Sequence, residues 1–198
     1  MQREDWNRKH GEGGLLFGAE PNRFLVDEVG DLEPGRALDV ACGSGRNAVW
    51  LAFRGWRVTG VDFSGVALDQ ARGLAAERGV EVEWVEADLL GWRPFDDAFD
   101  LIAVLYLQLS ADQLAAVLQR AVGGLAPGGT MLVVGHHRDN LEHGSGGPKD
   151  PGVLFAPEQV KETLRGAGLR VEKAAAVLRP REGEPDAIDA LVRARRSS

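Results

Sequence analysis

Two kinds of hydrophobic pattern alternate along this chain. Short runs such as RALDVA (36–41) and FDLIAVLYL (99–107) are largely apolar, as expected for strands that are buried on both faces. The stretches that follow Gly45 and Ser64 instead space their apolar residues three or four positions apart, which is typical of amphipathic helices. The pattern therefore predicts a chain in which strands and helices take turns.

The predicted strands cover residues 36–41, 56–62, 80–88, 99–107, 130–137, 168–179 and 187–195. The predicted helices cover residues 46–55, 64–78, 110–125 and 157–166, and a turn is predicted at 126–129. Residues 138–156 are rich in Gly, Pro and Asp, so we expect an irregular functional loop or lid there. The repeated strand and helix order, closed by two strands, predicts an α/β doubly wound sheet with right-handed crossovers.

Length, composition and charge narrow the class of protein. A chain of 198 residues with 44% hydrophobic and 27% charged residues is expected to form one globular domain. Its net charge of −7 argues against a nucleic-acid or anionic membrane surface, which favours a small-molecule substrate. A single cysteine, Cys42, excludes an internal disulfide framework, and no long apolar run is present. We therefore expect a cytoplasmic protein, as a monomer or homodimer.

A glycine-rich turn between the first strand and its helix carries the first candidate chemistry. Gly43-x-Gly45-x-x-Ala48 satisfies a dinucleotide fingerprint, because glycine lets a ligand approach the helix N-terminus closely. Asp62 ends the next predicted strand, where a carboxylate accepts hydrogen bonds from both hydroxyls of a ribose. That acid suits NAD and S-adenosylmethionine (SAM) equally well. The glycines alone are also compatible with an ordinary tight turn.

Five motifs in order resemble the class I SAM-dependent methyltransferases. They are LDVACGSGRNA (38–48), VTGVDFS (58–64), EADLL (86–90), FDLIAVLYL (99–107) and LAPGGTMLVV (125–134). The resemblance implies a Rossmann-like sheet of seven strands in the order 3-2-1-4-5-7-6, mostly parallel with an antiparallel C-terminal strand. It also implies transfer of a methyl group from SAM. Ala41 departs from the family, which usually has glycine there. FGAEPNRFL (17–25) and GHHRDN (135–140) are similar to small tellurite-resistance and thiopurine type methyltransferases.

The family's cofactor-binding positions carry over onto this sequence one by one. They fall on Asp39, Ala41, Gly43, Gly45, Asn47, Asp62, Phe63, Ser64, Ala87, Asp88, Leu89 and Val104. The resemblance implies that Asp39 faces the methionine moiety, Asp62 the ribose and Phe63 one face of the adenine. Asp88 and Leu89 would meet the adenine edge. Two simpler roles stay open, since Phe63 can pack in the core and Asp88 can cap a loop.

Candidate catalytic residues gather near the fifth predicted strand. Methyl transfer needs alignment above all, and a general base only when the nucleophile must lose a proton. His136 and His137 end that strand, and histidine is a residue type that can deprotonate a hydroxyl or an amine, while Tyr106 ends the fourth strand with a hydroxyl. Each of the three is equally compatible with a structural role. No metal is expected, because Tyr106 and Gln108 stand where metal-dependent O-methyltransferases have an acid.

The chain is divided into an N-terminal cover segment, 1–34, and a methyltransferase domain, 35–198. Trp6, Phe17 and Phe24 lie in a glycine-rich opening and are expected to fold over the ligand clefts. The alternative is a helix that packs on the sheet edge. Two alternative functions also stay open at this point, an NAD(P)-binding Rossmann oxidoreductase and a SAM-binding module without catalysis.

Overall fold

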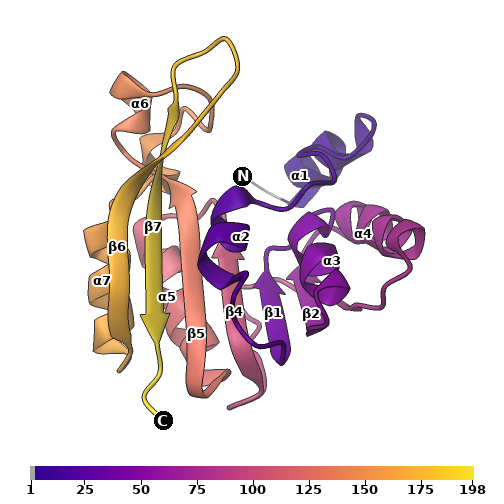
Figure 1. The fold of residues 1–198 in the computed structure, drawn as a ribbon. Helices are drawn as coiled ribbons and strands as arrows, with labels where there is room; N and C mark the ends of the chain where they lie inside the picture. The colour runs from indigo at the N-terminus through magenta and orange to yellow at the C-terminus, as the bar shows by residue number, and fades with distance from the viewer. Residues whose placement is uncertain (1–2) are drawn as a thin grey trace.

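A computed structural model describes residues 3–198, and its strands form one seven-stranded sheet in the order β3-β2-β1-β4-β5-β7-β6 (Figure 1). The strands are β1 (Arg36–Val40), β2 (Arg57–Asp62), β3 (Glu83–Glu86), β4 (Phe99–Leu105), β5 (Leu125–His136), β6 (Arg170–Arg179) and β7 (Ala187–Arg195). β7 runs antiparallel to both of its neighbours, and all other pairs are parallel. The predicted strand order and the antiparallel C-terminal strand are confirmed.

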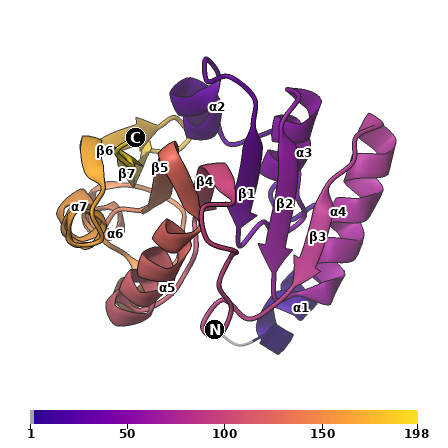
Figure 2. The same ribbon diagram turned by 90° about the horizontal axis from the view of Figure 1, so that it is seen from below.

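Helices cover both faces of this sheet (Figure 2). They are α1 (Arg3–Gly11), α2 (Arg23–Val29), α3 (Arg46–Phe53), α4 (Gly65–Arg78), α5 (Ala111–Gly123), α6 (Asn140–His143) and α7 (Pro157–Gly166). Leu38 and Ile102 belong to the core cluster with α5 and α7, whereas Ala37 and Leu101 belong to the cluster with α2 and α3. Because neighbouring strand residues point to opposite faces, both faces must be apolar. This explains the continuous apolar runs.

Serine residues begin two of the helices, as predicted. The Ser64 hydroxyl accepts a hydrogen bond from the Ala67 amide at 3.2 Å, and the Ser110 hydroxyl accepts from Gln113 in a capping box. Each cap satisfies an amide that the helix itself leaves free. Within residues 3–198, the structure has no helix that is both long enough and apolar enough to cross a membrane.

Several predicted boundaries are wrong by a few residues, among them those of β3, α5 and β5. β3 begins at Glu83 rather than at 80, because Gly79 ends α4 in the left-handed conformation and the Val80 amide donates to Ala75. α5 ends at Gly123, two residues early. β5 includes the predicted turn, but the register jumps from Leu125 to Thr130 opposite β4, so residues 126–129 still loop out of the pairing.

The loop at 138–156 is more ordered than predicted. It contains α6 and a short 3-10 helix, Pro151–Val153. Asn140 is buried and holds the loop together, since its amide nitrogen donates to the Gly146 carbonyl at 2.9 Å and its oxygen accepts from the Ile188 amide at 2.7 Å. The loop is thereby attached to β7, which periodicity alone does not indicate.

Candidate active site

The glycine-rich turn after β1 makes a tight reversal at the carboxyl edge of the sheet. Ala41, Gly43 and Gly45 have φ angles of 58°, 53° and 79°, in the left-handed region that favours glycine. A Cβ on Gly45 would lie 2.7 Å from atoms of both Ala71 and Trp84, so glycine is required for close packing of α4 and β3. Ala41 adopts this conformation despite its side chain, and that conformation accounts for the glycine usual in the family.

Asp39 lies beside this turn with its carboxylate unsatisfied. Its side chain is buried, and within residues 3–198 neither carboxylate oxygen makes a hydrogen bond of ordinary length and angle, although the Ala48 amide lies near enough to act on it. Burial raises the pKa of Asp39 to about 7, and the charge of Asp62 adds to that shift, while the Ala48 amide and Arg46 oppose it. A buried carboxylate without a partner is costly in a folded protein, so this position is suited to receive a donor from a ligand.

Arg46, the first residue of α3, provides positive charge at the same turn. Its guanidinium donates to the Phe17 carbonyl at 2.9 Å and lies 5.7 Å from the centre of the Phe17 ring. The charge also interacts with Asp39 and Tyr106. Arg46 forms no ion pair with a carboxylate in the described part of the chain. It was not among the predicted site residues.

Asp62 ends β2 and is held by backbone amides. Its two oxygens accept hydrogen bonds from the Gly43 and Ser64 amides, each at 2.9 Å. Burial raises the pKa of Asp62, and these amides oppose the shift. Each oxygen keeps a second lone pair for a ligand hydroxyl. The structure therefore positions this carboxylate at the glycine turn, where sequence reasoning expected it.

Helix α1 lies above this edge, next to α4 (Figure 1). Asn7 accepts a hydrogen bond from the Ser64 hydroxyl at 2.6 Å, and Gln70 donates to the His10 carbonyl at 2.7 Å. The His10 ring is buried, 3.2 Å from the Ser44 hydroxyl, and burial lowers its pKa. α1 thus covers the glycine turn, whereas Phe24 is buried in the core on α2 and Phe17 stays exposed.

The other predicted cofactor residues lie around the same edge in different environments. Asn47 accepts a hydrogen bond from the Asn22 amide at 2.8 Å, so its oxygen already fixes the start of α2. Phe63 is partly exposed, and Asp88 is exposed with one oxygen accepting from the Leu90 amide. Leu89 and Val104 are buried core residues, and the Ala87 amide donates to the Asp62 carbonyl.

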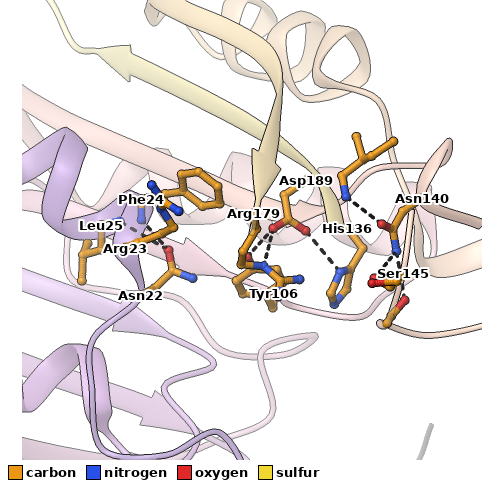
Figure 3. Close-up of polar contacts among 12 residues, drawn as sticks. Asn22, Arg23, Phe24, Leu25, Tyr106, His136, Asn140, Ser145, Arg179 and Asp189 are labelled. Atoms are coloured by element: carbon orange, nitrogen blue, oxygen red, sulfur yellow. Dashed lines mark hydrogen bonds and ion pairs between the residues drawn. The ribbon is translucent and has the colours of Figure 1, made fainter. Parts of the chain in front are cut away.

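A second polar cluster lies at the carboxyl ends of β4 and β5, against β6 and β7 (Figure 3). Asp189 is fully buried at its centre. It accepts hydrogen bonds from the Tyr106 hydroxyl and the Arg179 Nε, both at 2.7 Å, and its other oxygen lies 3.3 Å from Nδ1 of His136. The Tyr106 and His136 rings pack together with centroids 4.8 Å apart.

Within this cluster the negative charge of Asp189 is paired with the positive charge of Arg179. Burial opposes ionisation of Asp189, but the donors His136, Arg179 and Tyr106 outweigh it and lower the pKa of Asp189. Burial and the charge of Asp189 raise the pKa of Tyr106, so its phenol stays protonated. Tyr106 is therefore a hydrogen-bond donor here and not a base.

The remaining histidines do not join this cluster. His137 is buried, and its Nδ1 accepts from the Asp139 amide at 3.1 Å, which is a structural role at the start of α6. His143 is exposed beside Glu142. Of the three predicted catalytic residues, the structure brings together Tyr106 and His136. Within residues 3–198, no group of three His, Cys, Asp or Glu side chains is arranged to hold a metal ion.

Asp189 and Arg179 were missed by sequence reasoning. The only indication was an aspartate inside the otherwise apolar stretch AIDAL (187–191), where a buried strand position calls for a partner. His136 pairs with Asp189 in the register of β5 and β7, which no local pattern reveals.

Comparisons with known proteins agree with the fold. Residues 37–129 match a family model described as a methyltransferase domain. A demethylmenaquinone methyltransferase of Thermus thermophilus is 36% identical over 124 residues, which are 61% of this chain and 56% of that protein. A ribosomal protein L11 methyltransferase of Thermus thermophilus is 32% identical over 170 residues, or 83% and 59%. The chain spans little more than half the length of these relatives.

Solved structures match over nearly the whole chain. One, described by the conversion of a disulfide bond into a thioacetal group in echinomycin biosynthesis, has a TM-score of 0.79 at 23% identity, covering 100% of this chain and 92% of that chain. The Burkholderia thailandensis 1,6-didemethyltoxoflavin-N1-methyltransferase has a TM-score of 0.73 at 21% identity, covering 99% and 87%. TehB of Haemophilus influenzae has a TM-score of 0.72 at 17% identity, and the match covers 99% of this chain and 68% of that chain. At such identities the likeness concerns the fold alone, so the narrower resemblance to tellurite-resistance enzymes stays a prediction.

Proposed function

We propose that this chain, whose residues 37–129 match a methyltransferase domain, is a class I SAM-dependent methyltransferase that methylates a small molecule at the carboxyl edge of its sheet. The observation that carries the proposal is the buried, unpartnered carboxylate of Asp39 beside the left-handed glycine turn. An ammonium group supplies the donors that this carboxylate lacks. The methionine moiety of SAM carries such a group, next to a carboxylate.

The residues around the glycine turn after β1 fit SAM as a set. When bound, SAM supplies an activated methyl group. Asp39 would hold its ammonium, and Arg46, which has no carboxylate partner in the described chain, would hold its carboxylate together with the turn amides. Asp62 would accept from the ribose hydroxyls through its remaining lone pairs. Phe63 would cover the adenine, and Asp88 would accept from the adenine amine.

The cluster around Asp189 would line the acceptor side. β4 pairs with β1 and with β5, so Tyr106 lies one strand away from Asp39 and His136 two strands away. Ligands of open α/β sheets bind outside the carboxyl ends of neighbouring strands. The net charge of −7 disfavours a nucleic-acid acceptor. One structural neighbour, a 1,6-didemethyltoxoflavin-N1-methyltransferase, has a small molecule, 1,6-didemethyltoxoflavin, bound together with SAH.

The N-terminal segment, 1–34, would act as a cover of the cofactor. α1 rests on Ser64 and Gln70 of α4 through a few side-chain contacts rather than through a shared core. A helix attached in this way can open at low cost to admit a ligand. α2 belongs instead to the sheet packing, with Phe24 and Leu25 buried.

Titration calorimetry with SAM, S-adenosylhomocysteine (SAH) and NAD tests the proposal. We expect SAM and SAH to bind and NAD to give no heat. NAD binding without SAM binding would overturn the proposal and support an oxidoreductase. SAM binding together with no SAH release, across a broad panel of small acceptors, would instead support a binding module without catalysis.

A further inference from the structure

We propose that the acceptor binds with an acidic proton, on a hydroxyl or a ring N–H, and that Nε2 of His136 accepts this proton while Asp189 positions the ring. The inference rests on the proposed methyltransferase function and specifies its substrate class. Asp189 and His136 are directly opposite in the β5 and β7 register, and Nδ1 of His136 lies 3.3 Å from Oδ1 of Asp189. Both atoms are buried, the contact lacks hydrogen-bond angles, and neither atom has another partner within residues 3–198, so each is the only polar group available to the other.

The partners of Asp189 determine which ring nitrogen of His136 carries the proton. Asp189 is fully buried and receives donors from Arg179 and Tyr106, so it is an ionised carboxylate that only accepts hydrogen bonds. The nitrogen that faces it, Nδ1, must therefore be the protonated one in the neutral ring. Nε2 then keeps a free lone pair, as a general base requires.

The His136 ring is fixed in this orientation from both sides. The Tyr106 ring packs on it, and a Cβ on Gly147 would lie 2.9 Å from Nδ1, so the loop approaches closely. Asn140 anchors that loop to β7. The side chain of His136 is 12% exposed while Nδ1 itself is buried, so the accessible part of the ring lies away from Asp189. The free nitrogen is thus the one that a ligand can reach.

Two charged groups lie near the ring, Asp189 on β7 and its ion-pair partner Arg179 on β6. The Tyr106 phenol, directly after β4, is neutral. An imidazolium formed on His136 would face the Asp189 carboxylate directly. In the overall exchange the acceptor atom gains the methyl group, its proton passes to Nε2, and the methyl–sulfur bonding pair stays on sulfur to give SAH. Water then removes the proton from His136.

An NMR measurement on the ligand-free protein tests the geometry independently of activity. Protein labelled with ¹⁵N-histidine is recorded at a pH where the rings are neutral, and the His136 signals are assigned by their absence in His136→Gln. We expect the Nδ1–H tautomer in the wild type. We expect Asp189→Asn to lose this preference, because an amide can also donate. An Nε2–H tautomer in the wild type would overturn the proposal.

A screen of acceptors with and without an acidic proton tests whether His136 acts as the general base. Phenols and N–H heterocycles are compared with thioethers and tertiary amines, which carry no acidic proton, and SAH release is measured. Since general bases contribute about 10²–10⁴-fold, we expect His136→Gln to slow methylation of protic acceptors by about 100-fold or more. His143→Gln, which changes an exposed histidine outside the cluster, should leave the rates unchanged.

The outcomes separate this inference from the proposed function. If wild-type protein binds neither SAM nor SAH, the methyltransferase function fails, whatever the tautomer of His136. If SAM binds but methylation is confined to aprotic acceptors, or His136→Gln methylates phenols at the wild-type rate, His136 is not the general base. The proposed methyltransferase function is unaffected by that result. Tyr106→Phe keeps the Arg179 pair with Asp189 intact, and provides a folded variant in case Asp189→Asn is unstable.

Discussion

Asp39 and Asp189 are both buried aspartates on strands, yet their surroundings are opposite. Asp39 makes no hydrogen bond of ordinary length and angle in the described chain, and burial raises its pKa to about 7. Asp189 accepts hydrogen bonds from Tyr106 and Arg179 and lies 3.3 Å from Nδ1 of His136, and these groups lower its pKa although burial opposes this. The proposed cofactor site at Asp39 therefore needs a ligand to supply a donor, whereas side chains of the protein supply the donors at Asp189.

The two aspartates therefore affect stability in opposite directions. The folded pKa of Asp39 lies above its unfolded value of 3.8, so its ionisation lowers the stability of the folded state as pH rises from about 3.8 to about 7, and the full loss is present above 7. The folded pKa of Asp189 is depressed, so its contribution is present above the unfolded value and is lost as pH falls through the lower folded pKa. Substitution by asparagine at each of the two positions distinguishes these opposite effects on stability.

Asp189→Asn is expected to have the largest effect. It leaves the half-buried Arg179 without its carboxylate, and removal of one partner of a buried ion pair costs about 3–5 kcal/mol. We expect the free energy of unfolding in urea near neutral pH to fall by about 3 kcal/mol, and the deficit to shrink in acid. Asp69→Asn, at an exposed ion pair, is the matched control. An unchanged unfolding midpoint in Asp189→Asn would contradict the comparison.

Asp39→Asn is expected to weaken SAH binding by ~100-fold, about 2.7 kcal/mol, because the ammonium loses its charged acceptor. The ligand-free variant should become more stable than the wild type above pH 7, by on the order of 2 kcal/mol, since a buried charge is removed. Calorimetry and urea unfolding measure both effects. In the wild type, SAH affinity should fall as pH drops below about 7, where Asp39 protonates, and this dependence should flatten in the variant. Equal affinity in the two proteins would refute the assignment.

The smallest expected effect concerns helix α1 and the loop at 138–156, and limited proteolysis tests it. Trypsin sites at Arg8 and Lys9 lie on α1, and Arg138 and Lys149 lie in the loop anchored by Asn140. We expect SAH to slow cleavage in α1 several-fold, because it closes the cover, and to change cleavage at 138–156 little, because that loop is already fixed. Ligand protection of the loop alone would reverse this expectation.

Sequence patterns are most informative where the residues of a site lie close together along the chain. The residues of the cofactor edge from Asp39 to Ser64 lie within two successive strand and helix units, so periodicity and a glycine turn suffice to bring them together. The strand order followed from the family motifs. Even here, side chains such as Asn47 and Ser64 have structural hydrogen bonds that a motif does not reveal.

The acceptor edge was decided by the tertiary structure. Tyr106 meets Asp189 across 83 positions of sequence, and Arg179 reaches it across 10, through a hairpin whose register fixes the contact. A shift of that register by one residue would turn Asp189 to the other face of the sheet. The sequence by itself thus determined the alternation of strands and helices and predicted a cofactor site at the glycine turn, because both depend on short-range patterns. The contact of His136 with Asp189 depends on long-range strand pairing, which only the folded sheet defines.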